Sequence, residues 1–394
     1  MMIIKEKKAF VPCYLIDEEK LRENLSLIKR ISDEGDVEII LALKAFANWK
    51  VFKIIREYVA HTTASSPYEA RLSAEHFGGL TYTYSPAYEE ETFHDILRYS
   101  DHITFNSLSQ LNRFYPAIKK YENSESGHCV SIGLRINPEY SEIETDLYNP
   151  CSRGSRFGVT ADVLNGLLPD GVEGLHFHCL CENNSSSLVN VLKAVEEKFG
   201  LLLDKVKWLN MGGGHLVTRK GYDVDLLLNC LKEIHMRHPR LKIIMEPGSA
   251  FLWETGCLVS SVVDVVENGG IKTAVLNVSF TCHMPDCLEM PYYPKVRGAE
   301  HFCLSDEDAM IFDDCVYRLG GNSCLSGDFM GYWKFKKPLD VGDEVVFEDM
   351  IHYTTVKTNM FNGVHHPSIA IKHSDGRIEL LKRFEYKDYE GRMD

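Results

Sequence analysis

The sequence lacks the features of several large protein classes. Its longest apolar runs are about ten residues, whereas a membrane-spanning helix needs about 20. The N-terminus has a short apolar start followed by lysines, the reverse of a secretory signal. Twelve cysteines are scattered without a Cys-x-x-Cys pair, which is typical of reduced thiols. These absences predict a cytoplasmic protein with no membrane segment.

Basic residues are also scarce relative to acidic ones. The chain has 43 Lys and Arg against 57 Asp and Glu, a formal net charge of −14. Nucleic-acid-binding proteins are usually basic, so we expect no nucleic-acid partner. An acidic chain suits cationic small substrates, although many enzymes are acidic for solubility alone. The apolar content of 44% is typical of a globular protein, and 394 residues predict two domains.

Short apolar runs alternate with amphipathic stretches from residue 36 to about residue 246. Such alternation implies parallel strands with helical crossovers. Eight runs have strand character: residues 37–44, 59–64, 80–85, 102–106, 129–137, 172–178, 206–211 and 241–248. Eight repeats predict an α/β fold, a (β/α)8 barrel of the TIM type.

The composition changes after residue 256, where β-branched residues and turns dominate. This texture predicts a mostly antiparallel β domain. Its expected strands are residues 257–268, 273–281, 343–349, 368–373 and 377–383. Residues 9–16 form another strand pattern, which could join the same domain. We therefore expect a barrel domain at residues 18–255 and a β domain built from residues 1–17 and 256–394.

Lys44 ends the first barrel strand, in the stretch "DVEIILALKAFAN". Active sites of such barrels lie at the C-terminal ends of the strands. A lone lysine at a strand end usually extends into solvent, so the alternative to a functional role is that Lys44 is an ordinary surface charge. The other strand ends, however, carry Arg135, His178, Gly212 to Gly214 and Glu246. A desolvated lysine in that company can form an imine with an aldehyde.

The last two barrel strands predict a cofactor site. Glycines 212–214 end the seventh strand, where backbone N–H groups can close on a phosphate; a flexible turn is the alternative. Glu246 ends the eighth strand among apolar residues and can hold a protonated pyridine nitrogen, unless it only caps a helix or forms an ion pair. With Lys44, these features predict pyridoxal phosphate.

His176 and His178 share one face of the sixth strand and allow two interpretations. A His-x-His pair at a barrel mouth can bind a metal, as in amidohydrolase-type enzymes, with Lys44 or Glu246 as further ligands. Alternatively, His178 packs on an aromatic cofactor and His176 is structural. The glycines favour the cofactor, because a metallohydrolase has no use for a phosphate site, and so we expect no metal.

Three loops of the expected β domain have a composition that indicates function rather than packing. The loop "GGNSCLSGDFMG" (320–331) holds Cys324 and Asp328, although a structural loop cysteine is the alternative. The stretch "CHMPDCLEMPYYP" (282–294) offers Asp286 and Tyr292. The stretch "HYTTVKTNMFNG" (352–363) offers Tyr353.

Six motifs in one order, "ALKAF", "HFH", "GGGH", "EPG", "SCLSGD" and "Y…FNG", resemble a known family over nearly the whole chain. This family is the alanine-racemase-type (fold type III) pyridoxal-phosphate decarboxylases of ornithine, arginine, diaminopimelate and carboxynorspermidine. The segments "EPGSAF", "CHMPDCLEMPYYP", "GNSCLSGDFMG" and "VKTNMFNG" are most similar to its carboxynorspermidine branch. The resemblance implies decarboxylation of carboxynorspermidine or carboxyspermidine in bacterial polyamine biosynthesis.

The resemblance also implies a role for each matching residue. The expected catalytic residues are Lys44, His178 and Cys324. The expected cofactor-binding residues are Lys44, Arg135, His178, Gly213, Gly214, Glu246, Gly248, Ser249 and Tyr353. Candidate substrate-binding residues are Glu182, Glu246, Asp286, Tyr292 and Asp328. Cys324 is expected to protonate the product carbanion at the cofactor of the other subunit, which implies a homodimer with its active sites at the subunit interface.

Three departures from the family pattern bear on the substrate. Ser249 stands where relatives have a phosphate-holding arginine, and Cys181 where they have a phosphate-contacting serine. Leu325 stands where the ornithine and diaminopimelate enzymes carry a carboxylate, so Asp286 and Glu182 become the candidates for the distal nitrogens. The alternatives are a diaminopimelate, arginine or ornithine decarboxylase, a non-catalytic regulatory relative, or a metallohydrolase.

Overall fold

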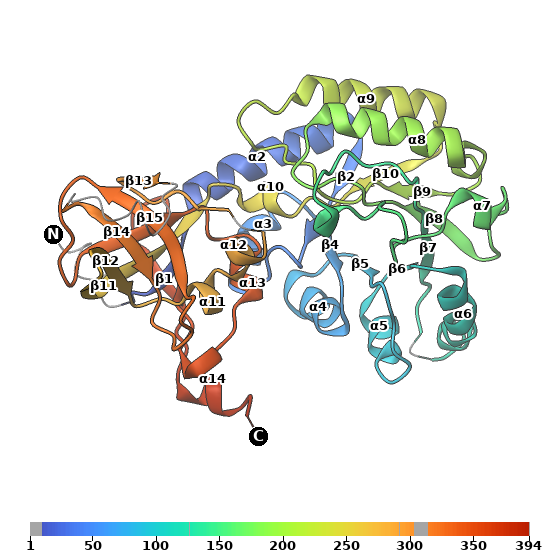
Figure 1. Ribbon diagram of the computed structural model, residues 1–394. Coiled ribbons are helices and arrows are strands. Elements are labelled where there is room, and N and C mark those ends of the chain that lie inside the picture. The colour runs from blue at the N-terminus through green and yellow to red at the C-terminus, as the bar shows by residue number, and fades with distance from the viewer. Residues whose placement is uncertain (1–9, 126, 291, 303–313, 394) are drawn as a thin grey trace. The chain divides into compact units, whose positions relative to one another are not determined.

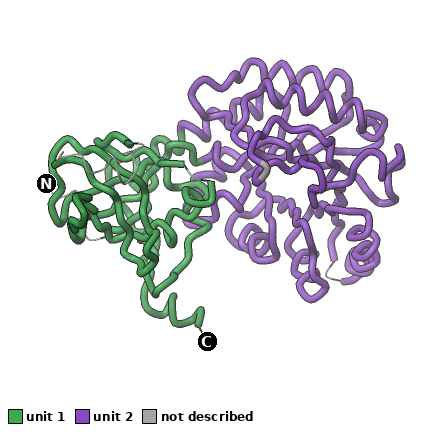
Figure 2. The backbone as a smooth tube through the Cα atoms, viewed as in Figure 1, with its two compact units in different colours: residues 1–22, 252–394 green, residues 23–251 purple. Residues whose placement is uncertain are grey.

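The computed structural model describes residues 10–125, 127–290, 292–302 and 314–393. The chain divides into two compact units (Figure 2). We call residues 23–251 the barrel unit, and residues 1–22 together with 252–394 the β unit. Within the ranges just given, no helix has the length and hydrophobicity that crossing a membrane requires.

The barrel unit is a closed ring of parallel strands, as the sequence predicts. The ladder runs β2-β10-β9-β8-β7-β6-β5-β4-β3. Its first and last members belong to one segment interrupted at Ile40, so the sheet closes on itself (Figure 1). The strands are β2 (Val37–Ile39), β3 (Leu41–Ala42), β4 (Thr62–Ala64), β5 (Thr81–Tyr84), β6 (His102–Phe105), β7 (Ser131–Arg135), β8 (Val172–His176), β9 (Trp208–Asn210) and β10 (Lys242–Met245).

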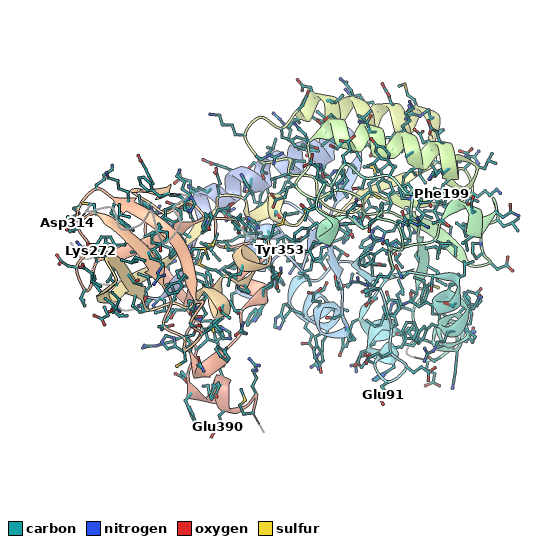
Figure 3. All side chains as sticks on the ribbon, in the orientation of Figure 1. Glu91, Phe199, Lys272, Asp314, Tyr353 and Glu390 are labelled. Carbon is teal, nitrogen blue, oxygen red and sulfur yellow. The ribbon has the colours of Figure 1, made fainter. Side chains whose placement is uncertain are left out.

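Helices precede, connect or follow these strands, and the longer ones each bury one apolar face. They are α2 (Glu18–Gly35), η1 (Trp49–Val51), α3 (Phe52–Ile55), α4 (Pro67–Leu72), η2 (Ser73–Phe77), α5 (Phe93–Tyr99), α6 (Leu108–Glu122), η3 (Asp146–Tyr148), α7 (Ala161–Leu164), α8 (Ser185–Leu203), α9 (Val224–Arg237) and α10 (Ser249–Leu252). Helix α8 buries Leu188, Val195 and Phe199, which recur at the helical period and include the residue marked in Figure 3. Helix α9 packs beside it (Figure 1).

The N-terminal end of the barrel is filled by a polar and aromatic plug. Glu38 accepts a 2.7 Å hydrogen bond from the Tyr82 hydroxyl and pairs with Lys242 at 2.7 Å. The His102 ring stacks on Tyr82 with 4.0 Å between centroids. Trp208 fills the space that Gly174 leaves open, since a Cβ there would lie 2.0 Å from the indole ring. With this end closed, the opposite end remains for a site.

The β unit holds a nine-stranded, mostly antiparallel sheet. Its order is β13-β15-β14-β12-β11-β1-β17-β18, and β16 pairs with β11. The strands are β1 (Cys13–Asp17), β11 (Gly256–Asn268), β12 (Ile271–Leu276), β13 (Ala299–Phe302), β14 (Val316–Gly320), β15 (Phe329–Phe335), β16 (Glu344–Glu348), β17 (Ser368–Lys372) and β18 (Ile378–Lys382). The α/β barrel with a separate antiparallel sheet confirms the expected fold class.

The loops of the β unit contain short helices rather than long connections. They are α11 (Phe280–His283), α12 (Pro285–Glu289), α13 (Thr354–Lys357), η5 (Phe361–Gly363) and α14 (Tyr386–Glu390). The strand expected at residues 273–281 is therefore wrong in its second half. Ser279 ends the extended segment because its side chain caps α11, accepting a hydrogen bond from the Cys282 N–H at 3.2 Å.

Candidate active site

Four predicted residues emerge at the C-terminal ends of the barrel strands. Lys44 lies in the turn after β3, and Arg135 is the last residue of β7. His178 follows β8 by two residues, and Glu246 directly follows β10. Lys44 is close enough to Arg135 and Glu246 for both charges to act on its pKa. The structure therefore brings these side chains together at the barrel mouth.

The Lys44 ammonium has no fixed partner. Its side chain is half-buried, and no hydrogen bond or ion pair joins it to any residue that the structure describes. Burial lowers the pKa of Lys44, and the positive charge of Arg135 lowers it further. The negative charges of Glu246 and Glu69 oppose this shift. A lysine with a lowered pKa is a better nucleophile near neutral pH.

Glu246 is a buried carboxylate fixed by two neighbours. Its Oε1 lies 3.1 Å from His176 Nε2, and its Oε2 accepts a 3.1 Å hydrogen bond from the Asn210 side-chain amide. Burial alone would raise the pKa of Glu246, but His176, Lys44 and Asn210 outweigh burial and bring it to about 2. Glu246 is therefore anionic at neutral pH and can hold a cationic nitrogen.

His178 is held in one ring orientation. Its Nδ1 accepts a 2.9 Å hydrogen bond from the Gly213 N–H. Burial lowers the pKa of His178 well below its usual value, and the charges of Lys44 and Arg135 add to the shift. The ring is therefore neutral, and because Nδ1 accepts, Nε2 carries its proton.

The glycine loop serves the site differently from the sequence expectation. The Gly212 N–H donates to Asn210 Oδ1 at 2.8 Å, and the Gly213 N–H donates to His178. Two of the three amides are thus already used. The amides of Gly214, Ser249 and Ala250 donate to no residue in the described part of the chain. These three amides can bind a phosphate.

Gly213 contributes to the site through its missing side chain. A Cβ there would lie 2.6 Å from the Glu246 carbonyl oxygen and 3.3 Å from His178 Cε1. The absent side chain therefore lets the glycine loop pack closely against the Glu246 backbone and the His178 ring. The anionic Glu246 and the unpaired amides fit the ring nitrogen and phosphate of pyridoxal phosphate.

Arg135 is committed to protein contacts. Its guanidinium donates to the Tyr84 hydroxyl at 2.7 Å and to the His178 carbonyl at 3.2 Å. It also lies over the Phe157 ring, 4.5 Å from the centroid. With 5% of its surface exposed, Arg135 orients the segment that carries His178 and adds positive charge beside Lys44.

Glu69 lies near Lys44 as well, although no sequence pattern predicts it. Its Oε2 accepts a 2.7 Å hydrogen bond from the Ser65 N–H at the start of α4. Burial raises the pKa of Glu69, and nearby Lys44 lowers it. The available signal was Ser66-x-x-Glu69, a pattern that indicates helix capping and gives no reason to link Glu69 to Lys44.

Two predicted residues share one loop of the β unit. Cys324 is exposed, and its N–H donates to the Asn362 side chain at 2.8 Å. Asp328 is buried and accepts hydrogen bonds from the Phe280 N–H at 2.8 Å and the Ser323 hydroxyl at 2.6 Å. Asp328 therefore shapes the loop that presents Cys324, and its assignment to substrate binding stays a prediction.

The remaining predicted residues lie on loops or, like Asp286 in α12, in a short helix. Asp286 Oδ2 accepts hydrogen bonds from Thr354 at 3.0 Å and Tyr292 at 3.3 Å, and burial raises its pKa. Its Oδ1 is buried without a partner among the described residues. Tyr353, marked in Figure 3, has a φ of 50° just before α13. Glu182, in the barrel unit, is exposed with a φ of 54°.

The metal alternative has a geometric basis. Ligand atoms of His176, His178 and Glu246 lie within 4.8 Å of one another. These residues also form hydrogen bonds within the protein, because His176 Nε2 bonds Glu246 and His178 Nδ1 accepts from the Gly213 N–H. This geometry therefore fits either a metal or a pyridine ring.

Residues 13–351 match a family model described as "Pyridoxal-dependent decarboxylase, C-terminal sheet domain". The chain belongs to the pyridoxal-dependent decarboxylases. This decarboxylase is 48% identical to the carboxyaminopropylagmatine decarboxylase of Synechocystis sp. The match covers 97% of this chain and 95% of the relative. It is 40% identical to the carboxynorspermidine/carboxyspermidine decarboxylase of Campylobacter jejuni, over 97% of the chain and 98% of the relative.

A third relative and a solved structure agree with this placement. The carboxynorspermidine/carboxyspermidine decarboxylase of Herminiimonas arsenicoxydans is 34% identical, over 96% of this chain and 98% of that one. The crystal structure of carboxynorspermidine decarboxylase from Campylobacter jejuni, complexed with norspermidine, superposes with a TM-score of 0.87. It is 39% identical and covers 97% of this chain and 99% of its own. The predicted family and its polyamine branch are confirmed.

Proposed function

We propose that this decarboxylase binds pyridoxal phosphate at the barrel mouth and removes the carboxyl group of carboxynorspermidine or carboxyspermidine. The observation that carries the proposal is the anionic Glu246, fixed by His176 and Asn210 near a lysine with a lowered pKa. The relatives named for these substrates, 40% and 34% identical over nearly the full chain, support the choice.

The residues divide the work of holding the cofactor. Lys44 would bind its aldehyde carbon, and Glu246 would accept a hydrogen bond from its ring nitrogen. The amides of Gly214, Ser249 and Ala250 would hold its phosphate, with Tyr353 as a further phosphate ligand. When bound, pyridoxal phosphate supplies a ring that accepts the electron pair left behind as CO2 departs.

Two residues are assigned to cofactor packing and to proton donation. The neutral His178 ring, fixed by Gly213, would pack on the cofactor face and keep water away. Cys324 would donate a proton to the substrate α-carbon after CO2 has left. Its thiol lies in an exposed loop whose shape depends on Asp328. Asp286, whose Oδ1 has no partner in the described chain, is our candidate for a distal substrate nitrogen.

A second candidate substrate is favoured by the 48% identical relative, which is named for carboxyaminopropylagmatine. All three compounds carry a carboxylated aminopropyl group, which the barrel mouth would treat alike. They differ at the far end, which is a primary ammonium in the first two and a guanidinium in the agmatine derivative. The class of reaction is therefore the same, and only recognition of the distal cation separates the candidates.

A product assay tests both the polyamine class of the substrate and the choice of substrate within that class. Purified protein with pyridoxal phosphate would be offered the three carboxylated polyamines and, separately, diaminopimelate, ornithine and arginine. We expect norspermidine or spermidine to form with the highest kcat/KM. If aminopropylagmatine forms faster, the substrate assignment changes to carboxyaminopropylagmatine and the proposed mechanism stays the same. Lysine, putrescine or agmatine as the main product would contradict the polyamine assignment.

We also propose a homodimer in which Cys324 serves the cofactor of the second subunit. Mixing the Lys44→Ala variant, expected to be inactive, with the Cys324→Ala variant, expected to be slow, under exchange conditions tests this. If the two residues come from different subunits, random pairing restores about a quarter of wild-type activity, because each mixed dimer keeps one intact site. If both residues come from one subunit, the mixture stays as inactive as its components.

A further inference from the structure

Cys151 and Cys179 form a close sulfur pair that the decarboxylase mechanism does not use. Their Sγ atoms lie 3.4 Å apart. Cys179 directly follows His178, and Cys151 lies in the β7 loop, which we define as residues 137–158. From this geometry, we propose that Cys151 and Cys179 are a reversible disulfide-forming site.

The two thiols differ as an attacking and a resolving cysteine should. Cys151 is half-buried on the loop, so a small oxidant can reach it, whereas Cys179 is 1% exposed. The hydrogen bond between the two sulfurs lowers the pKa of Cys151, and the nearby Arg135 and Lys198 charges act in the same direction. Burial raises the pKa of Cys179. Cys151 is therefore the thiol that ionises more readily, and thiolates react first with peroxides.

The oxidant we assign is hydrogen peroxide, and the chemistry balances with two thiols. The Cys151 thiolate attacks one peroxide oxygen, which breaks the O–O bond, forms a sulfenic acid and, with one proton, releases water. The Cys179 sulfur then attacks the Cys151 sulfur, its proton leaves with the hydroxyl as a second water, and the S–S bond forms. Two thiols are oxidised by two electrons, and one peroxide is reduced to two waters.

The loop can supply the movement that the bond requires. A disulfide has an S–S length of about 2.05 Å, so the sulfurs must approach by a little over 1 Å. Cys179 is fixed, because its carbonyl accepts a 2.8 Å hydrogen bond from the Ser141 hydroxyl and the residue itself is buried. The Cys151 N–H donates to the Asn149 side chain at 2.9 Å and its thiol contacts the Tyr140 backbone, and because both partners lie in the β7 loop, Cys151 can shift together with this loop. The bond would tie the β7 loop to the residue beside His178.

Peptide mapping under non-reducing conditions tests the site without relying on activity. Holoprotein treated with hydrogen peroxide, then alkylated and digested with trypsin, should give peptide 136–153 linked to peptide 157–193, because trypsin cleaves after Arg153 and Arg156. The linked species should replace the alkylated form of peptide 136–153 and disappear with dithiothreitol. Cys151→Ser and Cys179→Ser should each abolish the link.

The second peptide also contains Cys181, which is exposed and provides the matched control. Cys181→Ser should leave the link intact. A link that survives Cys179→Ser and is lost in Cys181→Ser would overturn the assignment. So would Cys151 found as a sulfinic acid, or still alkylated, with no linked peptide. Circular dichroism of each variant shows that the fold is kept.

Discussion

The Nε2 atom of His176 lies 3.1 Å from the Oε1 atom of Glu246, and both side chains are buried. Burial lowers the pKa of His176, so the ring is neutral and donates its Nε2 proton to the carboxylate. Its Nδ1 has no partner among the residues that the structure describes. His176 therefore acts through Glu246, fixing the carboxylate that the cofactor ring requires.

Glu246→Gln should lower kcat/KM by on the order of 100-fold or more, because a neutral amide cannot keep the ring nitrogen protonated. Pyridoxal phosphate should still bind, since Lys44 and the phosphate-binding amides are unchanged. Steady-state kinetics with a cofactor titration measure both quantities. Glu233→Gln, on the exposed face of α9, is the control and should behave like wild type. Equal kinetics for Glu246→Gln and this control would contradict the role of Glu246.

Gly213→Ala should weaken cofactor binding at least tenfold. The added Cβ would lie 2.6 Å from the Glu246 carbonyl oxygen and press on the His178 ring, so the cofactor site must distort. Gly200→Ala is the matched control, because a Cβ at Gly200 on α8 meets nothing within 4 Å. Fluorescence titration with pyridoxal phosphate compares the two variants. Tight cofactor binding by Gly213→Ala would show that the site does not need a residue without a side chain at position 213.

Glu69→Gln should shift cofactor capture to lower pH. Glu69 and Glu246 both raise the pKa of Lys44, so removing one negative charge leaves the lysine pKa lower still. The Lys44 amine of the variant is then neutral, and therefore reactive, at a lower pH than in the wild type. The rate of pyridoxal phosphate capture, followed by absorbance across pH, measures the shift. Glu75→Gln, whose partner is Arg71 at 2.7 Å on the protein surface, should not move the profile. A shift to higher pH for Glu69→Gln would be the wrong sign.

His102 should make the barrel unit sensitive to acid. Burial lowers the pKa of His102 to about 4, whereas an unfolded histidine has a pKa of about 6.5. As the pH falls through this window, the unfolded chain binds a proton that the folded chain refuses, so the unfolding free energy decreases by up to about 1.4 kcal/mol per pH unit. Above pH 6.5 this contribution is constant.

His102→Phe keeps a ring against Tyr82 and removes the titration. Urea unfolding at several pH values should show a shallower loss of stability between pH 6.5 and 4 for this variant than for wild type. His94→Phe, at a surface position, should keep the wild-type slope. Identical slopes for all three proteins would show that His102 does not titrate differently on folding.

The sequence predicted the barrel strands well because buried parallel strands are continuous apolar runs. The observed ladders are shorter than the runs, so β3 ends at Ala42 and β8 at His176. Lys44 and His178 lie just beyond, which agrees with the rule that sites sit at strand ends. Spacing alone could not show that the Gly213 amide would be taken by His178, since that contact joins separate strands.

The β unit was less predictable. Strands β14 and β15 have the sequences "VYRLG" and "FMGYWKF", which mix charged, glycine and aromatic residues and show no regular alternation. Their connection was nevertheless identified as a loop, and Cys324 lies in it. The roles of Asn210 and Glu69 depend on contacts with strands and turns far along the chain, for which the sequence carries no local signal.

The measurement that tests the central claim most directly is reduction of the protein with borohydride in the presence of pyridoxal phosphate, followed by peptide mapping. We predict a pyridoxyl group on Lys44 and on no other lysine, and metal analysis of the same sample should find no stoichiometric ion. Label on a different lysine, or an unlabelled protein that holds a metal lost on replacing His176, would contradict the cofactor site described above.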